Sequence, residues 1–440
     1  MQIKKFVLIA ALISSVSCSL NRGGGELVGT RNSKKWFEPT PFGMVLIPTG
    51  STIIGQNQED ITWSLSNPPK TVSIQAFYMD ETEITNDEYR QFVNYVIDSI
   101  RRQRLVDEGF DEFLMQDRQG NILEPQRLDW NRRIDLRRNE EYKDALATME
   151  YSGDDKIKAG EINTRKLIYS YSWFDFEQAA QNDRYYDPEK DEYTGGFVIN
   201  AKGEKEAIKS RSSFIMKKAV RIYPDTLCWL KDFTYTYNEP FVKNYFSHPG
   251  YDNYPVVGIS WHQAQAFCNW RTQLYSSSAK IQVQDWRLPS EAEWEYASRG
   301  GLIGQKYPWG GPYVPTKKGC YVANFKPKRG NYIADGGMIT VEVGTYEPNG
   351  YGLYDMAGNV AEWTADSYDE SAPFITGDLT PSYKTIPSET DNRILKRKII
   401  RGGSWKDVAY FLQNGVRTYE YQDSSRSYIG FRTIRTKIEH

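Results

Sequence analysis

The chain has 440 residues, and its 55 lysines and arginines against 57 aspartates and glutamates give a formal net charge of −2. Phosphate recognition needs a concentrated positive field, so this balance excludes nucleic-acid binding as the main role. Aromatic residues make up 14 % of the chain, which excludes a largely disordered protein. With three histidines and four cysteines, neither a histidine-based metal centre nor a disulfide-stapled scaffold is expected.

The N-terminus has the pattern of an export signal. Lys4 and Lys5 precede an apolar run of 11 residues, 6–16. A membrane-spanning helix needs about 20 residues, so this run indicates a signal peptide over residues 1–17. The small residues before Cys18 resemble the bacterial lipobox, in which the cysteine is lipidated. The alternative is an ordinary signal peptide with an incidental cysteine.

A lipidated Cys18 would make residues 18–40 a tether, and the glycines at 23–25 make that tether flexible. Acyl chains anchor a protein through their buried methylene groups. The residue directly after Cys18 is not an aspartate. By resemblance to bacterial lipoproteins, this indicates the outer membrane. We therefore expect a lipid-anchored protein on the periplasmic face of the outer membrane.

The folded domain is expected over residues 41–440, and its first part alternates short strands with one helix. Residues 43–50, 72–74 and 77–79 are apolar or alternating runs bounded by turn residues. Thr85 with Glu88 forms a capping box that predicts a helix start. Apolar residues then recur on one helical face: Tyr89, Phe92, Val93, Val96, Ile97 and Ile100.

A change in composition marks an insertion over about residues 101–245. Residues 101–170 carry 14 basic and 15 acidic side chains, and mixed signs favour a solvated insertion. Residues 171–247 are rich in tyrosine, phenylalanine and aspartate. Such a stretch is either a locally packed insertion or a surface that binds another protein, because aromatic residues are enriched at interfaces.

The remainder of the chain has few strong secondary-structure signals. A strand is predicted over 254–259, a helix from Ser260 to Leu274, and a second helix after Ser290, whose capping box uses Glu293. Residues 301–440 are rich in glycine, proline and asparagine. Bound cations or aromatic anchors would have to hold such long irregular segments.

Several motifs occur together in a fixed order over residues 41–95 and 248–435. They are Met44–Pro48, Thr82–Asn86, Pro255–Trp261, Cys268–Trp270, Arg287–Ala297, Tyr307–Gly310, Gly350–Trp363, Arg401–Trp405 and Gly430–Arg432. In this order they resemble the formylglycine-generating enzyme (sulfatase-modifying factor) family. The resemblance implies an α+β fold that is irregular and C-type-lectin-like, with little regular secondary structure and here a large charged and aromatic insertion.

The family's oxidation chemistry uses two cysteine thiolates that bind copper(I), and soft sulfur ligands suit this ion. The matching positions hold Asp407 and Leu412, and residues 401–440 contain no cysteine. Ser404 matches the family's site serine. We therefore expect no copper, no catalytic residue and no enzyme activity, a conclusion that depends on the alignment at Asp407.

The resemblance also implies calcium sites with a structural role. One set would be Asp355, the carbonyls of Gly358 and Val360, and Glu362. A second would be Asn324, the Phe325 carbonyl, Asp335 and the Gly337 carbonyl. Carboxylate and carbonyl oxygens are the ligands that calcium prefers, but such residues are also typical of metal-free turns.

Within the family, the lipobox, the block 77–93 and the charged insertion resemble the GldK/PorK lipoproteins of type IX secretion and gliding motility. That resemblance implies a non-catalytic scaffold, which self-associates into a ring and binds a periplasmic GldN/PorN-type partner. The alternatives are an active formylglycine-generating oxidase and a ligand-binding surface lipoprotein. No phosphate-binding or hydrolase motif supports other chemistry, and the lone imidazole of His262 is read as a surface or core histidine.

Overall fold

The computed structural model describes residues 38–56, 67–151, 160–235, 239–278, 284–316 and 319–438. The predicted signal peptide, Cys18 and nearly all of the tether lie outside these residues. One compact unit runs from Thr40 to His440. Among the described residues, no helix has both the length and the apolar character that crossing a bilayer requires.

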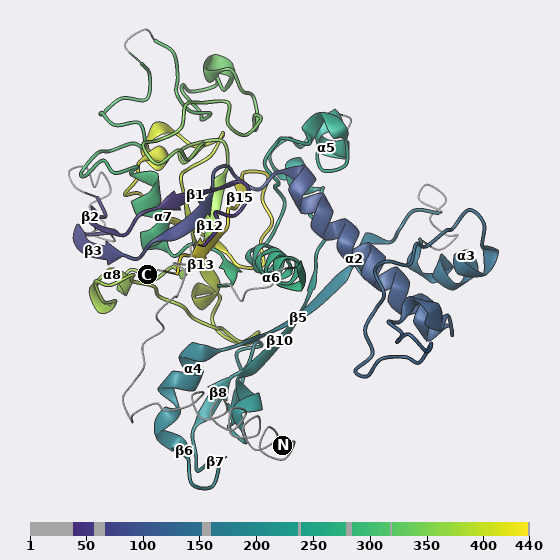
Figure 1. The fold of residues 1–440 in the computed structure, drawn as a ribbon. Helices are drawn as coiled ribbons and strands as arrows, with labels where there is room; N and C mark the ends of the chain where they lie inside the picture. The colour runs from purple at the N-terminus through teal and green to yellow at the C-terminus, as the bar shows by residue number, and fades with distance from the viewer. Residues whose placement is uncertain are drawn as a thin grey trace, which may run out of the picture. The chain divides into compact units, whose positions relative to one another are not determined.

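Two four-stranded sheets form the centre of this unit (Figure 1). The first has the order β1-β4-β16-β11 and the second the order β14-β13-β12-β15. Their strands are β1 (Met44–Ile47), β4 (Phe77–Asp80), β11 (Trp286–Arg287), β12 (Ala361–Ser367), β13 (Arg397–Arg401), β14 (Thr418–Tyr421), β15 (Ile429–Gly430) and β16 (Ile434–Thr436). Every residue of β4 is buried, because β4 lies between β1 and β16. The first and last parts of the domain therefore share one sheet.

A separate hairpin pairs β2 (Gly50–Ile54) with β3 (Lys70–Ile74). The outer edge of β3 is covered by the chain itself, since Ser73 N donates to Asp378 O at 2.8 Å and Thr380 N donates to Ser73 O at 2.8 Å. The strands predicted over 43–50, 72–74 and 77–79 are thus confirmed.

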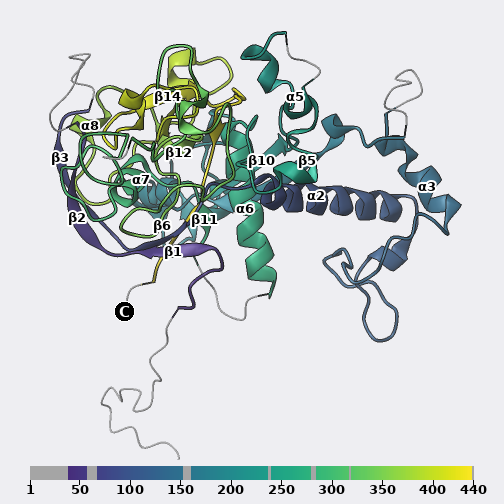
Figure 2. The same ribbon diagram turned by 90° about the horizontal axis from the view of Figure 1, so that it is seen from above.

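Three helices start at the capping residues that the sequence indicates. Thr85 caps α2 (Asn86–Asp107), Ser260 precedes α6 (Trp261–Ser278), and Ser290 caps α7 (Glu291–Ser298). Helices α2 and α6 pack through aromatic rings, and Tyr89 stacks on Phe267 with 5.7 Å between ring centroids. Figure 2 shows α2 continuing away from the sheets toward α3 (Glu140–Leu146).

The strand predicted over 254–259 is wrong. This segment makes one isolated bridge, between Thr85 and Pro255. Its other backbone partners come from separate parts of the chain, because Val256 N donates to Ile84 O at 2.8 Å and Gly258 N donates to Arg426 O at 2.9 Å. The apolar run is buried between these segments rather than paired in a ladder.

The predicted insertion forms two arms with small cores of their own. The first arm continues α2 and adds α3 (Glu140–Leu146), around a core of Leu105, Phe113, Tyr142, Leu146 and Met149. The second is a ribbon of β5 (Ile168–Phe174) and β10 (Ile215–Arg221), with a core of Val198, Ile208, Phe214 and Met216. It also carries α4 (Phe176–Gln181), β6 (Tyr186–Asp187), β7 (Glu192–Tyr193), β8 (Phe197–Ile199) and β9 (Lys205–Ala207), and α5 (Pro240–Asn244) follows it.

Both arms are rooted in the main body. Tyr169 and Tyr171 of β5 belong to the main core with α2 and α6, and Phe92 contacts Tyr169 with 5.2 Å between ring centroids. Trp229 packs against Trp405 in a further buried cluster. Many of the insertion's aromatic residues are therefore packed internally.

The C-terminal third has short strands, the small helix α8 (Ala372–Ile375) and long irregular segments. Buried ion pairs join these segments to β12 and α7. The Arg432–Glu362 pair at 2.7 Å joins the segment before β16 to β12, and the Arg417–Glu291 pair at 2.9 Å joins the segment before β14 to α7. These pairs and the aromatic clusters hold the long irregular segments, for which bound cations or aromatic anchors were expected. The architecture is α+β with little regular structure, as predicted.

Candidate functional site

The segment 404–412 holds the residues that the family resemblance predicts at the copper-ligand positions. The Ser404 hydroxyl donates to Asp407 Oδ2 at 2.5 Å, and Asp407 N donates to Ser404 O at 2.9 Å. Burial raises the pKa of the Asp407 carboxyl above its usual value. Leu412 is 1 % exposed and packs in a cluster with Tyr307 and Phe325. The two positions therefore offer a hard oxygen and a hydrocarbon, neither of which is a soft ligand.

The three described cysteines lie outside this segment and are unpaired. Cys228 and Cys268 are buried, and burial raises the pKa of each thiol well above its usual value. Cys320 is exposed. A raised thiol pKa disfavours the thiolate, which is the form that binds metals.

The structure brings the second predicted calcium set, which begins with Asn324, together in one loop. Asp335 Oδ2 accepts from Phe325 N at 2.6 Å, and Asp335 Oδ1 accepts from Gly337 N at 3.2 Å. Asn324 Nδ2 donates to Ile339 O at 2.8 Å. Its Oδ1 is buried without a hydrogen-bond partner, and it lies 2.9 Å from where a side chain on Gly337 would begin.

The first predicted set, which begins with Asp355, surrounds a tight turn. Asp355 has φ +54°, a left-handed conformation that is uncommon for residues other than glycine. Asp355 Oδ2 accepts from Gly344 N at 2.6 Å, whereas Oδ1 is buried without a partner. Burial raises the pKa of Asp355 to about 6. The turn also includes Gly358, whose N–H donates to Gly402 O at 2.9 Å.

Glu362, the last residue of this set, is already bonded. Arg432 Nη2 lies 2.7 Å from its Oε1, and Trp294 Nε1 donates to its Oε2 at 2.7 Å. Arg432 Nε also donates to both oxygens at 2.9 Å, so these bonds occupy most of the about four lone-pair positions of a carboxylate. The predicted role of Glu362 in cation binding stays a prediction.

Glu83 is a buried carboxylate to which the sequence analysis assigned no role. It is 0 % exposed, and it accepts from Asn359 Nδ2 at 3.0 Å and from Val360 N at 3.2 Å. Burial, and then the nearby carboxylates of Asp355 and Glu362, raise the pKa of Glu83 well above its usual value. Glu83 is one of three acidic residues in 77–84, with Asp80 and Glu81, and nothing in this stretch singles it out.

The donor set of these loops is compatible with a hard cation. Two buried oxygens, Asn324 Oδ1 and Asp355 Oδ1, lack partners, and burying such a group alone costs about 1–3 kcal/mol. The described parts of the chain contain no group of three or more His, Cys, Asp or Glu side chains placed to hold a metal ion. A cation would therefore depend on amide and main-chain carbonyl oxygens as well as on carboxylates, a mixture that calcium accepts.

These observations can be set beside known proteins. The model of the FGE-sulfatase family, described as a sulfatase-modifying factor enzyme 1-like domain, matches residues 32–437. This chain belongs to the FGE-sulfatase family. The match includes the predicted insertion as well as the motif blocks.

Curated relatives of this FGE-sulfatase domain include proteins named as inactive and proteins named as formylglycine-generating enzymes. The inactive C-alpha-formylglycine-generating enzyme 2 of Bos taurus is 36 % identical over 185 residues, 41 % of this chain and 49 % of that protein. The formylglycine-generating enzyme of Streptomyces coelicolor is 33 % identical over 190 residues, 42 % of this chain and 53 % of that protein. The chain thus spans about half the length of these relatives.

Among solved structures, PvdO from Pseudomonas aeruginosa is 16 % identical with a TM-score of 0.44. The similarity covers 90 % of this chain and 94 % of that protein.

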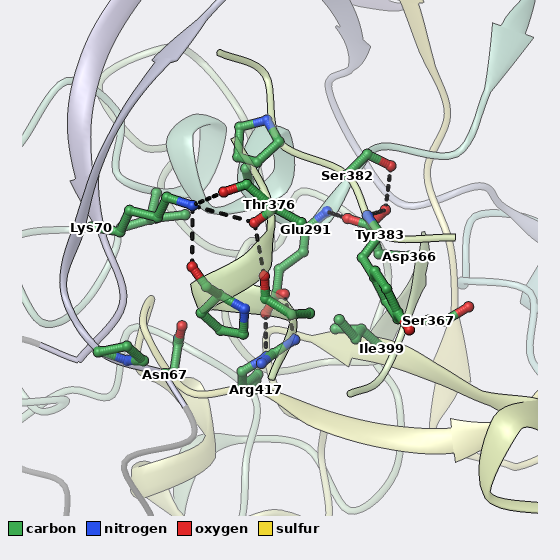
Figure 3. Close-up of a pocket in the computed structure, with 16 residues that line it drawn as sticks. Asn67, Lys70, Glu291, Asp366, Ser367, Thr376, Ser382, Tyr383, Ile399 and Arg417 are labelled. Carbon is green, nitrogen blue, oxygen red and sulfur yellow. Dashed lines mark hydrogen bonds and ion pairs between the residues drawn. The ribbon is translucent and has the colours of Figure 1, made fainter. Parts of the chain in front are cut away.

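A second feature of this FGE-sulfatase domain is a narrow pocket beside α7 and α8, with a cavity volume of about 40 Å³ (Figure 3). Asp366 accepts from Glu291 N at 2.7 Å, Ser382 Oγ at 2.5 Å and Tyr383 N at 3.1 Å. Burial raises the pKa of Asp366 to about 6. Lys70 Nζ donates to Thr376 O at 2.6 Å, and Arg417 bonds Glu291. Each of these charged groups thus has a partner within the protein, either a main-chain or hydroxyl group or an opposite charge, which makes the pocket part of the structural framework.

His262, the lone imidazole of α6, links α6 to the ribbon. Its Nδ1 lies 2.8 Å from Lys218 Nζ of β10, and its Nε2 lies 3.3 Å from Asp423 Oδ1. Burial lowers the pKa of the imidazole below its usual value. The contacts are structural, as the sequence analysis expected of this histidine.

Proposed function

We propose that this chain is a non-catalytic lipoprotein of the outer membrane, a structural ring component of the type IX secretion and gliding machinery. The proposal is supported first by Asp407 and Leu412 at the positions where the family's chemistry needs two thiolates. The lipobox at Cys18 and the block 77–93 support the finer assignment. The family itself contains a relative named as inactive, so a sequence of this kind does not require activity.

Asp407 is the observation that carries the non-catalytic reading. Its carboxylate is bonded by the Ser404 hydroxyl at 2.5 Å, so Ser404 is held by the same group that replaces the thiol. Leu412 fills the second position inside a buried apolar cluster. Binding a copper ion there would bury charge against hydrocarbon, which is costly without ligands.

We propose a structural calcium as the cofactor, and no copper. Asn324 and Asp335 would hold one ion and Asp355 the other, with carbonyls of Phe325, Gly337, Gly358 and Val360 and with Glu362 completing the sets. When bound, such an ion supplies charge that pins irregular loops. The partnerless oxygens of Asn324 and Asp355 support the assignment.

We propose that the two arms of the insertion bind a periplasmic partner of the GldN/PorN type. Each arm has its own buried core and is rooted in the main core through α2 or β5. Rooted arms of this kind can present a surface without the ordering cost of a disordered segment.

The test is extraction of the native membrane in mild detergent, followed by sizing and mass spectrometry of what stays bound. A megadalton particle with one dominant periplasmic partner supports the proposal, and a lone lipoprotein overturns it. A matched variant replaces residues 176–213 with Asn-Gly, since a two-residue turn can close the ribbon between Asp175 and Phe214. We expect this variant to remain in the membrane and to lose the partner.

Catalytic silence is tested separately on purified protein. The wild-type chain should bind no copper(I) and should not oxidise a sulfatase-derived cysteine peptide. The double variant Asp407→Cys and Leu412→Cys should gain copper(I) binding, because both soft ligands return. Copper(I) binding or peptide oxidation by the wild type would overturn the proposal.

A further inference from the structure

The ribbon of β5 and β10 directs alternate backbone groups away from itself. Asp175 N donates to Phe214 O at 2.9 Å, and Ile222 N donates to Leu167 O at 3.1 Å. In an antiparallel ladder the hydrogen-bonded pairs alternate with non-bonded ones. The N–H and C=O groups of Ile168, Ser170, Ser172 and Phe174 therefore point outward from β5.

No other strand covers this outer edge in the described parts of the chain, where β5 pairs only with β10 (Figure 1). The outer edge of β3 is covered, by contrast, because residues 378–380 form hydrogen bonds with Ser73 there. The β5 edge, defined as the outward groups of residues 168, 170, 172 and 174, is thus an unfilled template for strand pairing.

The β5 edge also lacks the usual protection. Natural edge strands carry charges, prolines or bulges that prevent pairing. Strand β5 has the sequence Ile-Tyr-Ser-Tyr-Ser-Trp-Phe and pairs with β10 in unbroken register over seven residues. The outer edge of β10, by contrast, carries Lys217 and Arg221. The two edges of the ribbon therefore differ, because only the β10 edge carries charged side chains that oppose pairing with another strand.

The order of side chains along β5 is self-complementary. In antiparallel pairing about Tyr171, Ile168 lies opposite Phe174 of the second strand, and Ser170 lies opposite Ser172. All four are residues whose backbone groups point outward, so the register satisfies both edges. Aromatic–aliphatic and Ser–Ser pairs are favourable cross-strand neighbours. Tyr169 and Tyr171 stay on the buried face, against α2 and α6.

We propose that the β5 edge binds the β5 edge of a second copy of this chain, across a two-fold axis. The pairing joins two ribbons into one four-stranded sheet of order β10-β5-β5-β10. It forms about eight new backbone hydrogen bonds. Lys217 and Arg221 lie on the outer strands, so the like charges of the two copies are not adjacent. This inference does not depend on the proposed function, because it uses only the ribbon.

The contact is small compared with stable dimer interfaces of about 1,600 Å². We therefore expect weak, concentration-dependent association of free chains. Copies held close together would associate more fully, since a high local concentration drives weak contacts.

The experiment is sedimentation equilibrium of the full chain in density-matched detergent, up to about 100 µM, where a micromolar contact is populated. The wild type should show reversible dimers. The variant S170E/S172E sets glutamates opposite glutamates, and the dimer dissociation constant should rise at least about tenfold. The variant S170K/S172E sets lysine opposite glutamate and should restore the dimer.

The control is Ala219→Glu, which adds one glutamate to the same ribbon face on β10, directly opposite Ser170 within one chain. It should dimerise like the wild type. Circular dichroism confirms that each variant is folded. A wild type that stays monomeric, a folded S170E/S172E that dimerises normally, or loss of the dimer in Ala219→Glu would each overturn the proposal.

Discussion

Arg432 is expected to be the most costly buried charge to remove. Its guanidinium is 0 % exposed. It bonds Glu362 through Nε at 2.9 Å and Nη2 at 2.7 Å, and it donates to the carbonyls of Asp80, Glu81 and Tyr354 at 2.9–3.3 Å. These contacts tie β4 and β12 to the loop before the Asp355 turn.

The substitution Arg432→Met keeps much of the side-chain volume and removes the charge. Glu362 then keeps only Trp294 Nε1, with Glu83 and Asp355 nearby. Breaking a buried pair in this way costs about 3–5 kcal/mol, because the remaining charge is buried without a partner of opposite sign. Adding Glu362→Gln to the same chain removes that charge and should recover about 1–2 kcal/mol.

Arg401→Met is the matched comparison. Arg401 is also 0 % exposed and also pairs with glutamates, but Glu295 would keep Arg299 at 2.6 Å and Gly55 N at 2.8 Å. Its cost should be smaller than that of Arg432→Met by at least about 1 kcal/mol. The assay is urea unfolding followed by near-ultraviolet circular dichroism, with excess chelator present. A loss below about 1 kcal/mol for Arg432→Met, or equal losses for the two variants, would refute this reasoning.

Three further predictions rest on single residues. Asn324→Ala and Asp355→Asn should each reduce the rise in melting temperature that calcium produces over chelator, measured by differential scanning calorimetry; an undiminished rise would remove these residues from the cation sites. Ser290→Ala should cost about 1 kcal/mol in urea unfolding, because Ser290 Oγ caps α7 at Glu293 N; Ser277→Ala, beyond the first turns of α6, is the control and should change little. Burial raises the pKa of Asp366 to about 6, above its unfolded value, so its stabilising contribution is complete below about pH 4 and is lost as the pH rises through 6. Unfolding measured from pH 5 to pH 7 should therefore show the wild type losing stability relative to Asp366→Asn, and parallel curves would contradict the assignment.

Local signals in the sequence predicted the parts of the fold that local physics decides. The capping boxes at Thr85 and Ser290 fix where α2 and α7 begin, since each uses residues three positions apart. The apolar face from Tyr89 to Val96 is buried as the helical period requires. The α+β character was implied by the family resemblance that the motif blocks carry.

Long-range pairing could not be predicted in the same way. Residues 254–259 have the composition of a strand, but Val256 and Gly258 bond to Ile84 and to Arg426, which are far away in sequence. Glu83 is buried because Asn359 and Val360 close over it. No pattern near Glu83 in the sequence predicts those partners. Its position beside Asp355 is therefore known only from the folded structure.

The residues of the candidate site and the buried ion pairs that hold the sheets are different residues. Ser404, Asp407 and Leu412 bond or pack within 404–412 and against the cluster around Tyr307. The Arg432–Glu362 pair and the Arg401 contacts hold the sheets through other residues. Asp407 and Leu412 therefore take no part in these buried ion pairs. Because β5 shares the main core with α2 and α6, that framework also supports the arm that carries the β5 edge, whatever occupies positions 407 and 412.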